Sequence, residues 1–244
     1  MSTAGEAWKS EALVRTFVDG IRYAIPLARE QTEVMLRLVE ARGTPVESFA
    51  DLGCGNGILS MALLERYPNA VATLVDFSDP MIVEARSLLK AHESSCRFTN
   101  ADLSEAQWTR SVAGRAPFDV VVSGYAIHHL PDPRKRQLYG EIFDLLKPGG
   151  LFANTEHVSS PTEWIESISD GLFIDSFHTH HSRRGSGMSR EQVAEEFLNR
   201  PDKAANILAP VELQCEWLRE CGFEDVDCYF KIFELAIFGG RRPR

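Results

Sequence analysis

The sequence predicts an α/β protein built around a mostly parallel sheet. Short apolar segments alternate along the chain with segments whose apolar residues recur at helical spacing, and the first such segment runs into a glycine-rich turn. Alternation of this kind produces parallel strands joined by right-handed crossover helices. The expected parallel strands are residues 48–52, 70–75, 95–99, 119–123 and 151–155, and two antiparallel strands are expected at 226–232 and 234–238. A length of 244 residues suits one large domain.

Two helical regions are expected outside this alternating pattern. Residues 1–47 have apolar residues at helical spacing but are interrupted at Ile25–Pro26, because proline disfavours a helical conformation in the residue before it. We expect them to form an N-terminal helical lid. The core then spans 48–244, with a helical insert at about 160–208. Ligands of open α/β sheets bind at the carboxyl ends of the strands, so the lid and the insert are expected to cover that edge.

Composition limits the classes of partner. The net charge of −9 argues against a broad phosphate-binding surface, so nucleic acid is an unlikely partner and a small molecule is the better expectation. The five cysteines are scattered and form no C-x-x-C pair, which indicates neither a disulfide framework nor a zinc site and fits a cytoplasmic protein. No apolar run approaches the roughly 20 residues that cross a bilayer, so no membrane contact is expected.

The glycine-rich turn has the composition of a ligand-binding loop. Gly53, Gly55 and Gly57 allow backbone angles closed to other residues and let the main chain approach a ligand closely. Residues 58–66 then read as a helix whose first N–H groups face the loop. The dinucleotide-binding spacing G-x-G-x-x-G is not met, because the third glycine comes too early and Ile58 follows it.

Five motifs together resemble the class I S-adenosylmethionine-dependent methyltransferases. They cover residues 49–155 and read DLGCGNG, VDFSDPM, NADL, FDVVVSGYAIHHL and LLKPGG. The resemblance implies a Rossmann-like class I methyltransferase fold, with a seven-stranded, mostly parallel sheet and an antiparallel last strand. It also implies S-adenosyl-L-methionine as the cofactor and methyl transfer to a small-molecule acceptor.

Carboxylates that follow successive strands are the main candidates for holding this cofactor. Asp76 can accept hydrogen bonds from both ribose hydroxyls, and Asp102 can accept one from the adenine amine while the backbone of Leu103 contacts the ring edge. A helix N-cap for the first acid and an ordinary turn for the second stay open as alternatives. The predicted cofactor-binding residues are Asp51, Gly53, Cys54, Gly55, Asp76, Phe77, Met81, Asp102, Leu103, Ser123 and Arg29.

Catalytic and acceptor-binding candidates surround the end of the fourth strand and the insert. His128 is the candidate general base, because a neutral imidazole accepts a proton near neutral pH, although the same segment can also serve only in packing. Tyr23 is the second catalytic candidate. Histidines and acids after the fifth strand could form a metal site, but residues 180–187 have the composition of a mobile loop and we expect no metal. The predicted substrate-binding residues are Tyr125, Glu156, His157, Asp175, His178 and Trp217.

The flanking segments resemble the carboxy-S-adenosylmethionine synthase branch. This resemblance covers residues 14–21, Ile25–Pro26, the insert and the tail 230–239. It implies a carboxylate-binding arginine in the helix before the last hairpin and a tyrosine after the front proline. Trp217 and Leu27–Ala28 stand at those places, and an indole cannot bind a carboxylate as a guanidinium does. We therefore expect ordinary S-adenosylmethionine.

Several alternatives stay open from the sequence. They are a carboxy-S-adenosylmethionine synthase-like tRNA-modification enzyme, an RNA methyltransferase and a non-catalytic cofactor-binding protein. Neither the acceptor nor the methylated atom is indicated, and a homodimer is compatible with the chain.

Overall fold

The sheet of the computed structural model follows the predicted topology. The structure describes residues 24–200 and 203–244. Seven strands lie in the order β3-β2-β1-β4-β5-β7-β6, and only β7 runs antiparallel to its neighbours. Their bounds are β1 Ser48–Leu52, β2 Val71–Asp76, β3 Cys96–Asn100, β4 Phe118–Gly124, β5 Leu146–His157, β6 Glu224–Ile232 and β7 Leu235–Arg241. The predicted fold class is confirmed.

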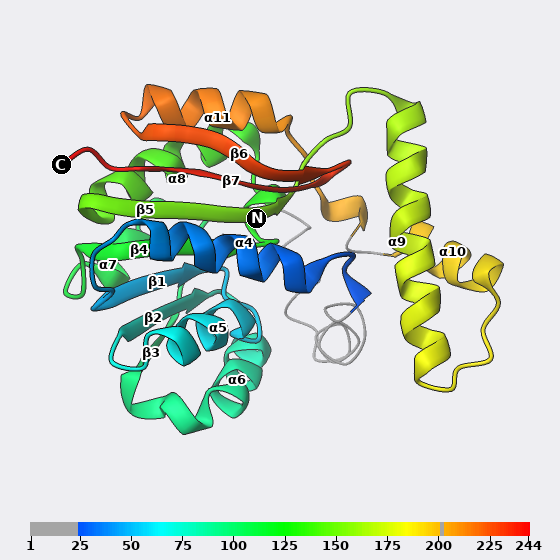
Figure 1. Cartoon of the computed structure of the whole chain (residues 1–244), viewed down its shortest axis with the longest axis horizontal. Coiled ribbons are helices and arrows are strands. Elements are labelled where there is room, and N and C mark those ends of the chain that lie inside the picture. Colours follow the sequence, from blue (N-terminus) through cyan, green and yellow to red (C-terminus); the bar gives the residue numbers. More distant parts are fainter. Residues whose placement is uncertain (1–23, 201–202) are drawn as a thin grey trace.

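Helices cover both faces of the sheet (Figure 1). One face carries α4 Ala28–Ala41, α5 Ile58–Arg66 and α6 Asp79–Leu88. The other carries α7 Trp108–Val112, α8 Asp132–Leu145 and α11 Val211–Glu220. Short 3-10 helices are η2 Lys90–Ser95, η3 Ile127–His129 and η4 Lys203–Ala205. The sheet therefore forms the middle of three layers.

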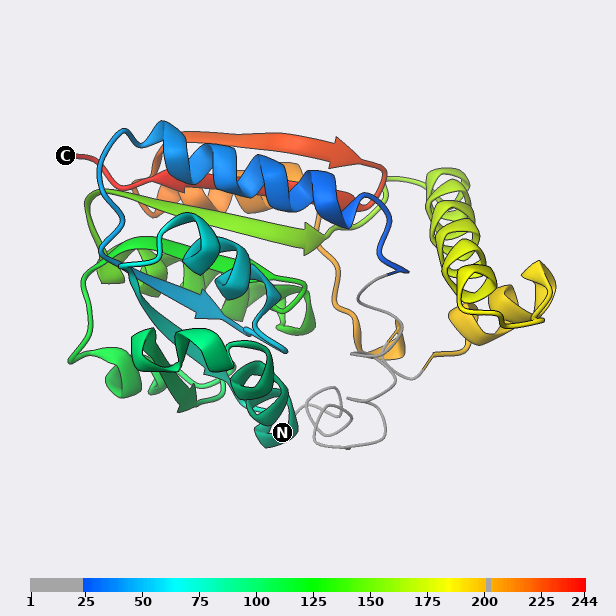
Figure 2. The same ribbon diagram turned by 60° about the horizontal axis from the view of Figure 1, so that its bottom comes forward.

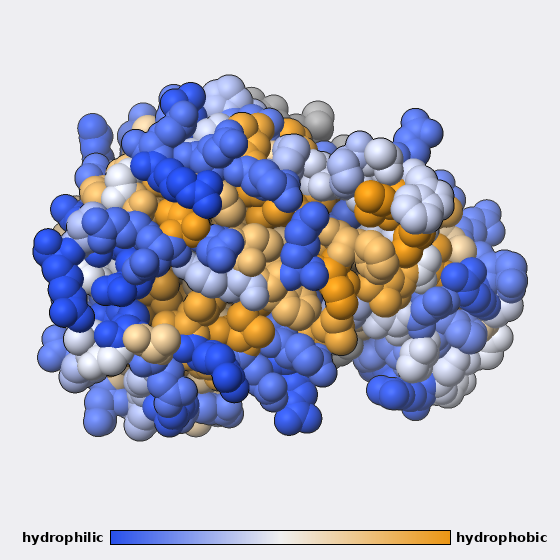
Figure 3. Space-filling view, turned by 45° about the horizontal axis from the view of Figure 1, so that its top comes forward, coloured by the Kyte–Doolittle hydropathy of each residue, from blue (hydrophilic) through white to orange (hydrophobic). Residues whose placement is uncertain are grey.

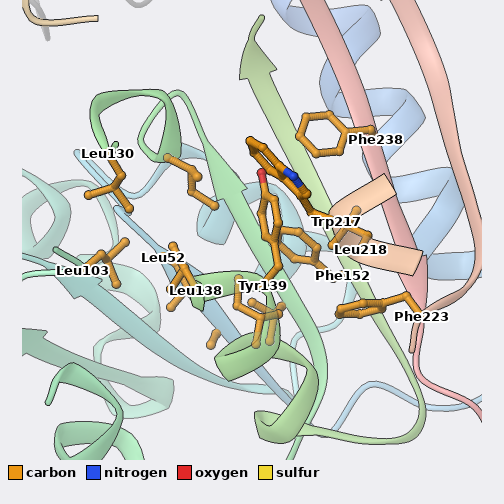
Figure 4. Close-up of a cluster of buried hydrophobic side chains, with 14 of the residues drawn as sticks. Leu52, Leu103, Leu130, Leu138, Tyr139, Phe152, Trp217, Leu218, Phe223 and Phe238 are labelled. Carbon is orange, nitrogen blue, oxygen red and sulfur yellow. The ribbon is translucent and has the colours of Figure 1, made fainter. Parts of the chain in front are cut away.

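Alternation along the strands builds two hydrophobic cores. Successive side chains of a strand point to opposite faces, so Phe49 of β1 packs under α4 and α5 while Ala50 packs under α8. In β4, Val121 likewise belongs to one core, and Val120 on its other side belongs to the second. The core under α8 and α11 is rich in aromatic rings (Figure 4).

The predicted N-terminal lid is only partly described. Residues 1–23, including Tyr23, lie outside the described residues. The expected break at Ile25–Pro26 is present: Leu27 adopts a left-handed conformation with φ 56°, and α4 begins after it. Met35 and Val39 of α4 are completely buried against the sheet. The apolar stripe of α4 therefore makes this helix a layer of the core, and the lid at residues 1–47 stays a prediction.

The insert forms helices beyond the carboxyl ends of the strands. Figures 1 and 2 both place α9 Glu163–Arg183 and α10 Arg190–Leu198 at this edge, apart from the main body. Both helices begin with a side-chain cap, from Thr162 and from Ser189. The loop expected at 180–187 is shorter than predicted, because α9 continues to Arg183. The chain then turns away at Gly185, which has φ 79°.

An apolar cluster joins the insert to the main body. It contains Phe173 and Phe177 of α9, Phe197 of α10, Ile25 of the front segment and Leu235 of β7. Figure 3 shows apolar side chains gathered on the face where the insert meets the rest of the molecule. Within the described residues, no helix has both the length and the apolar character needed to span a membrane.

Candidate active site

The glycine turn between β1 and α5 leaves an open backbone surface. Gly53 has φ 65°, and a Cβ at this residue would meet the Cβ of Ala126 at 2.2 Å. Gly55 has φ 52°, but a Cβ there would meet no described atom within 4 Å. The first glycine is therefore required by a close approach inside the protein. The second faces a space in which a ligand can contact the main chain.

Asp76 connects this turn to the end of β2. One carboxylate oxygen accepts a hydrogen bond from the Gly55 N–H at 2.8 Å, and the other accepts one from the Ser78 N–H at 2.9 Å. Burial raises the pKa of Asp76, although these backbone donors partly offset the increase. A carboxylate has about four lone-pair sites. Asp76 can therefore still accept hydrogen bonds from a diol placed over Gly55.

Two further residues predicted to bind the cofactor, Asp51 and Ser123, make hydrogen bonds within the protein. Asp51 is buried and accepts a hydrogen bond from the Ser60 hydroxyl at 2.7 Å. Ser123 is also buried, and its hydroxyl donates to the Leu52 carbonyl at 2.7 Å, which joins β4 to β1. These two contacts hold the strand ends in place beneath the glycine turn.

The segment after β3 lies at the same edge. Asp102 is exposed and accepts a hydrogen bond from the Ser104 N–H at 2.8 Å, which is the ordinary turn considered as an alternative. Leu103 is buried, and its carbonyl accepts from Arg134 Nε at 2.8 Å. The contact of both residues with adenine stays a prediction.

The other predicted cofactor residues differ in exposure. Cys54 and Met81 are buried, Phe77 is half-buried, and burial raises the pKa of the Cys54 thiol well above its usual value. Arg29 is exposed and pairs with Glu33 at 3.0 Å. Their contacts with a cofactor also stay predictions.

His128 and Glu156 form a buried pair at the ends of β4 and β5. His128 Nδ1 lies 2.5 Å from Glu156 Oε1, and the His128 N–H donates to Oε2 at 3.1 Å. Burial lowers the pKa of His128 well below its usual value and raises that of Glu156 to about 7. Glu156 is completely buried in this structure, and its contact with an acceptor stays a prediction.

A second pair lies beside the first. His157 Nε2 is 2.9 Å from Glu234 Oε2, and Ser169 of α9 donates to the same carboxylate oxygen at 3.3 Å. The His157 ring lies 5.6 Å from the ring of Phe173. His157 therefore connects the end of β5 to the insert. Glu234, in the tight turn before β7, was not predicted from the sequence.

Tyr125 joins the loop after β4 to the front segment. It adopts φ 55°, and its hydroxyl donates to Gln31 Oε1 at 2.5 Å. Gln31 is 2% exposed and donates to the Pro26 carbonyl at 2.8 Å. Gln31 was missed, although a polar residue one turn before Met35 on the apolar stripe of a helix is a detectable signal.

The remaining substrate candidates lie on the insert and in the core under α11. Asp175 is exposed and pairs with Arg190 at 2.6 Å within the insert, and His178 is half-buried on α9. Trp217 is packed in the core under α11, close to Tyr139 and Phe238 (Figure 4). Trp217 lies on the buried face of the amphipathic helix α11, and its contact with an acceptor stays a prediction.

A metal site was not expected after β5. In the part of the chain that the structure describes, no three His, Cys, Asp or Glu side chains are grouped to hold a metal ion.

Comparison with known proteins agrees with this geometry. Residues 49–150 match the model of a family described as a methyltransferase domain. The chain is 22% identical over 230 residues to a carboxy-S-adenosyl-L-methionine synthase of Nautilia profundicola, covering 93% of this chain and 91% of the synthase. It is 32% identical over 179 residues to a trans-aconitate 2-methyltransferase of Escherichia coli, covering 73% of this chain and 57% of that enzyme.

Solved structures show the same fold. Human N-acetylserotonin methyltransferase in complex with SAM matches with a TM-score of 0.62 and 15% identity, covering 98% of this chain. This chain spans 58% of the length of that human chain. Residues 49–150 therefore match a methyltransferase domain, the relatives and the sequence motifs support a class I S-adenosylmethionine-dependent methyltransferase, and the solved structures share its fold. Within that class, it is similar over nearly its whole length to carboxy-S-adenosylmethionine synthases.

Proposed function

We propose that this protein transfers the methyl group of S-adenosylmethionine to a small-molecule acceptor. The observation that carries the proposal is the link between the buried Asp76 carboxylate and the open turn at Gly55. Both lie at the carboxyl edge of the sheet, where open α/β folds bind ligands. The insert lies beyond the same edge, so an acceptor would bind between the two.

The residues of this chain contribute mainly positioning. When bound, S-adenosylmethionine supplies an electrophilic methyl group on its sulfonium. Asp76 and Asp102 would hold the adenosine part, and the backbone at Gly55 would admit the methionine part. Tyr125, fixed by Gln31, would line the acceptor side. Holding two reactants in line and excluding water can supply much of the rate enhancement without an enzyme nucleophile.

Cofactor binding tests the central assignment. We expect Asp76→Ala to weaken S-adenosylmethionine binding roughly 10- to 100-fold, because hydrogen bonds to a charged acceptor contribute about 1.5–3 kcal/mol. Isothermal titration calorimetry measures the change. Asp79→Ala is the matched control, since Asp79 is exposed at the same β2–α6 junction. Unchanged affinity in Asp76→Ala would contradict the assignment.

A carboxy-S-adenosylmethionine synthase is the second candidate. Similarity to these synthases extends over 93% of the chain. The position at which the resemblance to these synthases implies a carboxylate-binding arginine holds Trp217, a core residue, and Arg219 of α11 donates to the Val226 carbonyl at 3.0 Å. Mass spectrometry of the nucleoside that copurifies with the protein distinguishes the two. We expect the mass of unmodified S-adenosylmethionine or its demethylated product.

The acceptor, compartment and assembly are further proposals. A net charge of −9 supports a small molecule over RNA, and salt-insensitive activity on dialysable extracts would test this. Five thiols without a disulfide support a reducing cytoplasm. A homodimer is tested by light scattering of the purified protein. A non-catalytic cofactor-binding protein would bind S-adenosylmethionine without ever forming S-adenosylhomocysteine.

A further inference from the structure

The segment that leads from the insert back to α11 is joined to the loop after β4 by hydrogen bonds. Ile207 donates its N–H to the His128 carbonyl at 2.8 Å, and its own carbonyl accepts from Lys135 Nζ at 2.5 Å. The Lys135 side chain is completely buried and also donates to Asp132 at 2.6 Å. The Asn206 side chain hydrogen-bonds with the His128 ring. We call residues 206–209 the return segment.

The beginning of the insert, just after β5, is hydrogen-bonded to the return segment. The Ser159 N–H, just after β5, donates to the Ala209 carbonyl at 3.1 Å. Gln214 of α11 donates to the same carbonyl at 3.1 Å. Both ends of the insert therefore meet at one place, and the position of α9 and α10 over the sheet edge depends on it.

His128 stands at the centre of these contacts, and Glu156 holds it there. Glu156 bonds both the ring and the backbone N–H of His128, and it also accepts from the His157 N–H at 2.8 Å. A completely buried carboxyl group satisfied in this way keeps one ring orientation, because any other would leave buried polar groups without partners. The orientation that results is the one that Asn206 contacts.

We propose that His128 and Glu156 are positioning residues for acceptor binding: they fix the return segment to the loop after β4 and so hold the insert over the acceptor. This inference rests on the proposed methyl transfer. It gives His128 a role different from a general base, because the ring is engaged by Glu156 and by the return segment. Acceptor binding, and not the transfer step, then depends on the pair.

Backbone amide exchange of the full-length protein tests the fastening directly. We expect the amides of Ile207 and Ser159 to exchange about tenfold faster in Asn206→Ala and in Glu156→Leu, because both changes release the return segment. Glu156→Gln retains an oxygen acceptor and a donor for the ring, so it should keep more protection than Glu156→Leu. Asn199→Ala, an exposed residue of the same insert, is the matched control. Unchanged exchange in Asn206→Ala and Glu156→Leu would overturn the proposal.

Activity with a dialysable cell extract as the acceptor mixture tests positioning against catalysis. In Asn206→Ala, we expect the half-saturating amount of extract to rise about fivefold, the effect of one hydrogen bond, while the maximal rate of S-adenosylhomocysteine formation stays within twofold. Loss of the maximal rate at an unchanged half-saturating amount would overturn the proposal in favour of a catalytic role. If the wild-type protein forms no product with any extract, the proposed function fails. Amide exchange alone then decides whether His128 and Glu156 fix the return segment to the loop after β4.

Discussion

At the scale of single residues, two glycines of one turn have different reasons to be glycine. Both have positive φ values, 65° at Gly53 and 52° at Gly55, in which a side chain is strained. Only at Gly53 would a Cβ also strike another side chain, that of Ala126. The first glycine therefore serves the packing of the β4 loop on the turn, and the second serves a ligand.

This difference predicts that replacing glycine by alanine has different effects at the two positions. Gly53→Ala is expected to lower the free energy of unfolding by several kcal/mol, because strain is joined by a steric clash. Gly55→Ala should cost only about 1–2 kcal/mol of strain, yet weaken S-adenosylmethionine binding at least tenfold, since its methyl group would occupy the open side of the turn. Urea unfolding and calorimetry on both variants provide the comparison. Equal stability losses would contradict the distinction.

Site residues could be predicted only where their position along the chain indicates their role. The location of Asp76 could be predicted, because a carboxylate at the end of a buried parallel strand must lie at the carboxyl edge of the sheet. The pairing of His128 with Glu156 could not, since the two are 28 residues apart and meet only when β4 and β5 align. The burial of Trp217 could not be predicted, because in the sequence an indole at an apolar helical position looks the same whether it packs in a core or lines a site.

At the scale of elements, the regular parts of the sheet could be predicted closely and the insert less well. The bounds expected for β1 and α5 agree with the structure, because glycine or a change of periodicity marks their ends. The insert has a weaker pattern. Its cluster draws residues from α9, α10, β7 and the front segment, and no local sequence signal indicates such an association.

The aromatic cluster of the insert predicts that removing one of its rings, that of Phe197, destabilises only the insert. The Phe197 ring lies 5.6 Å from the rings of both Phe173 and Phe177, and Lys203 Nζ lies 4.9 Å from its centre. Phe197→Ala should destabilise the packing of α10 on α9 by about 3–5 kcal/mol. Hydrogen exchange is expected to rise in both helices and stay unchanged in β1 and β4. Leu198→Ala, at a half-exposed neighbour, is the control. Faster exchange throughout the sheet would show that the insert does not unfold separately.

At the scale of the whole molecule, stability and ligand binding are concentrated at opposite ends of the sheet. Beside the amino end of β4, Asp119 accepts hydrogen bonds from the backbone N–H groups of Glu47 and Ser48 at 2.9 and 3.0 Å. It also accepts one from Lys147 at 3.0 Å and lies 3.6 Å from the buried Arg42. These contacts join α4, β1, β4 and β5 far along the strands from Gly55 and Asp76.

This separation predicts a variant that loses stability but keeps cofactor binding. Asp119→Ala should lower the free energy of unfolding at pH 7 by roughly 3 kcal/mol, because it leaves Arg42 buried without its carboxylate, while S-adenosylmethionine affinity stays within about twofold. Asp225→Ala, which removes an exposed ion pair with Arg241, should cost less than about 1 kcal/mol. Urea unfolding and calorimetry measure the two quantities.

The same variant should show how the Asp119 contribution depends on pH. Burial alone would raise the pKa of Asp119, but hydrogen bonds from Lys147 and the backbone N–H groups of Ser48 and Glu47 outweigh it, and the pKa is lowered. Stability from a carboxyl group with a lowered pKa is fully present above its unfolded pKa of about 3.9 and is lost as the pH falls through the folded value. The difference in unfolding free energy between wild type and Asp119→Ala should therefore be constant from pH 7 to about 5 and shrink below about 4. A difference that persists undiminished at pH 3 would mean that the lost stability comes from the packing of the side chain and not from its charge.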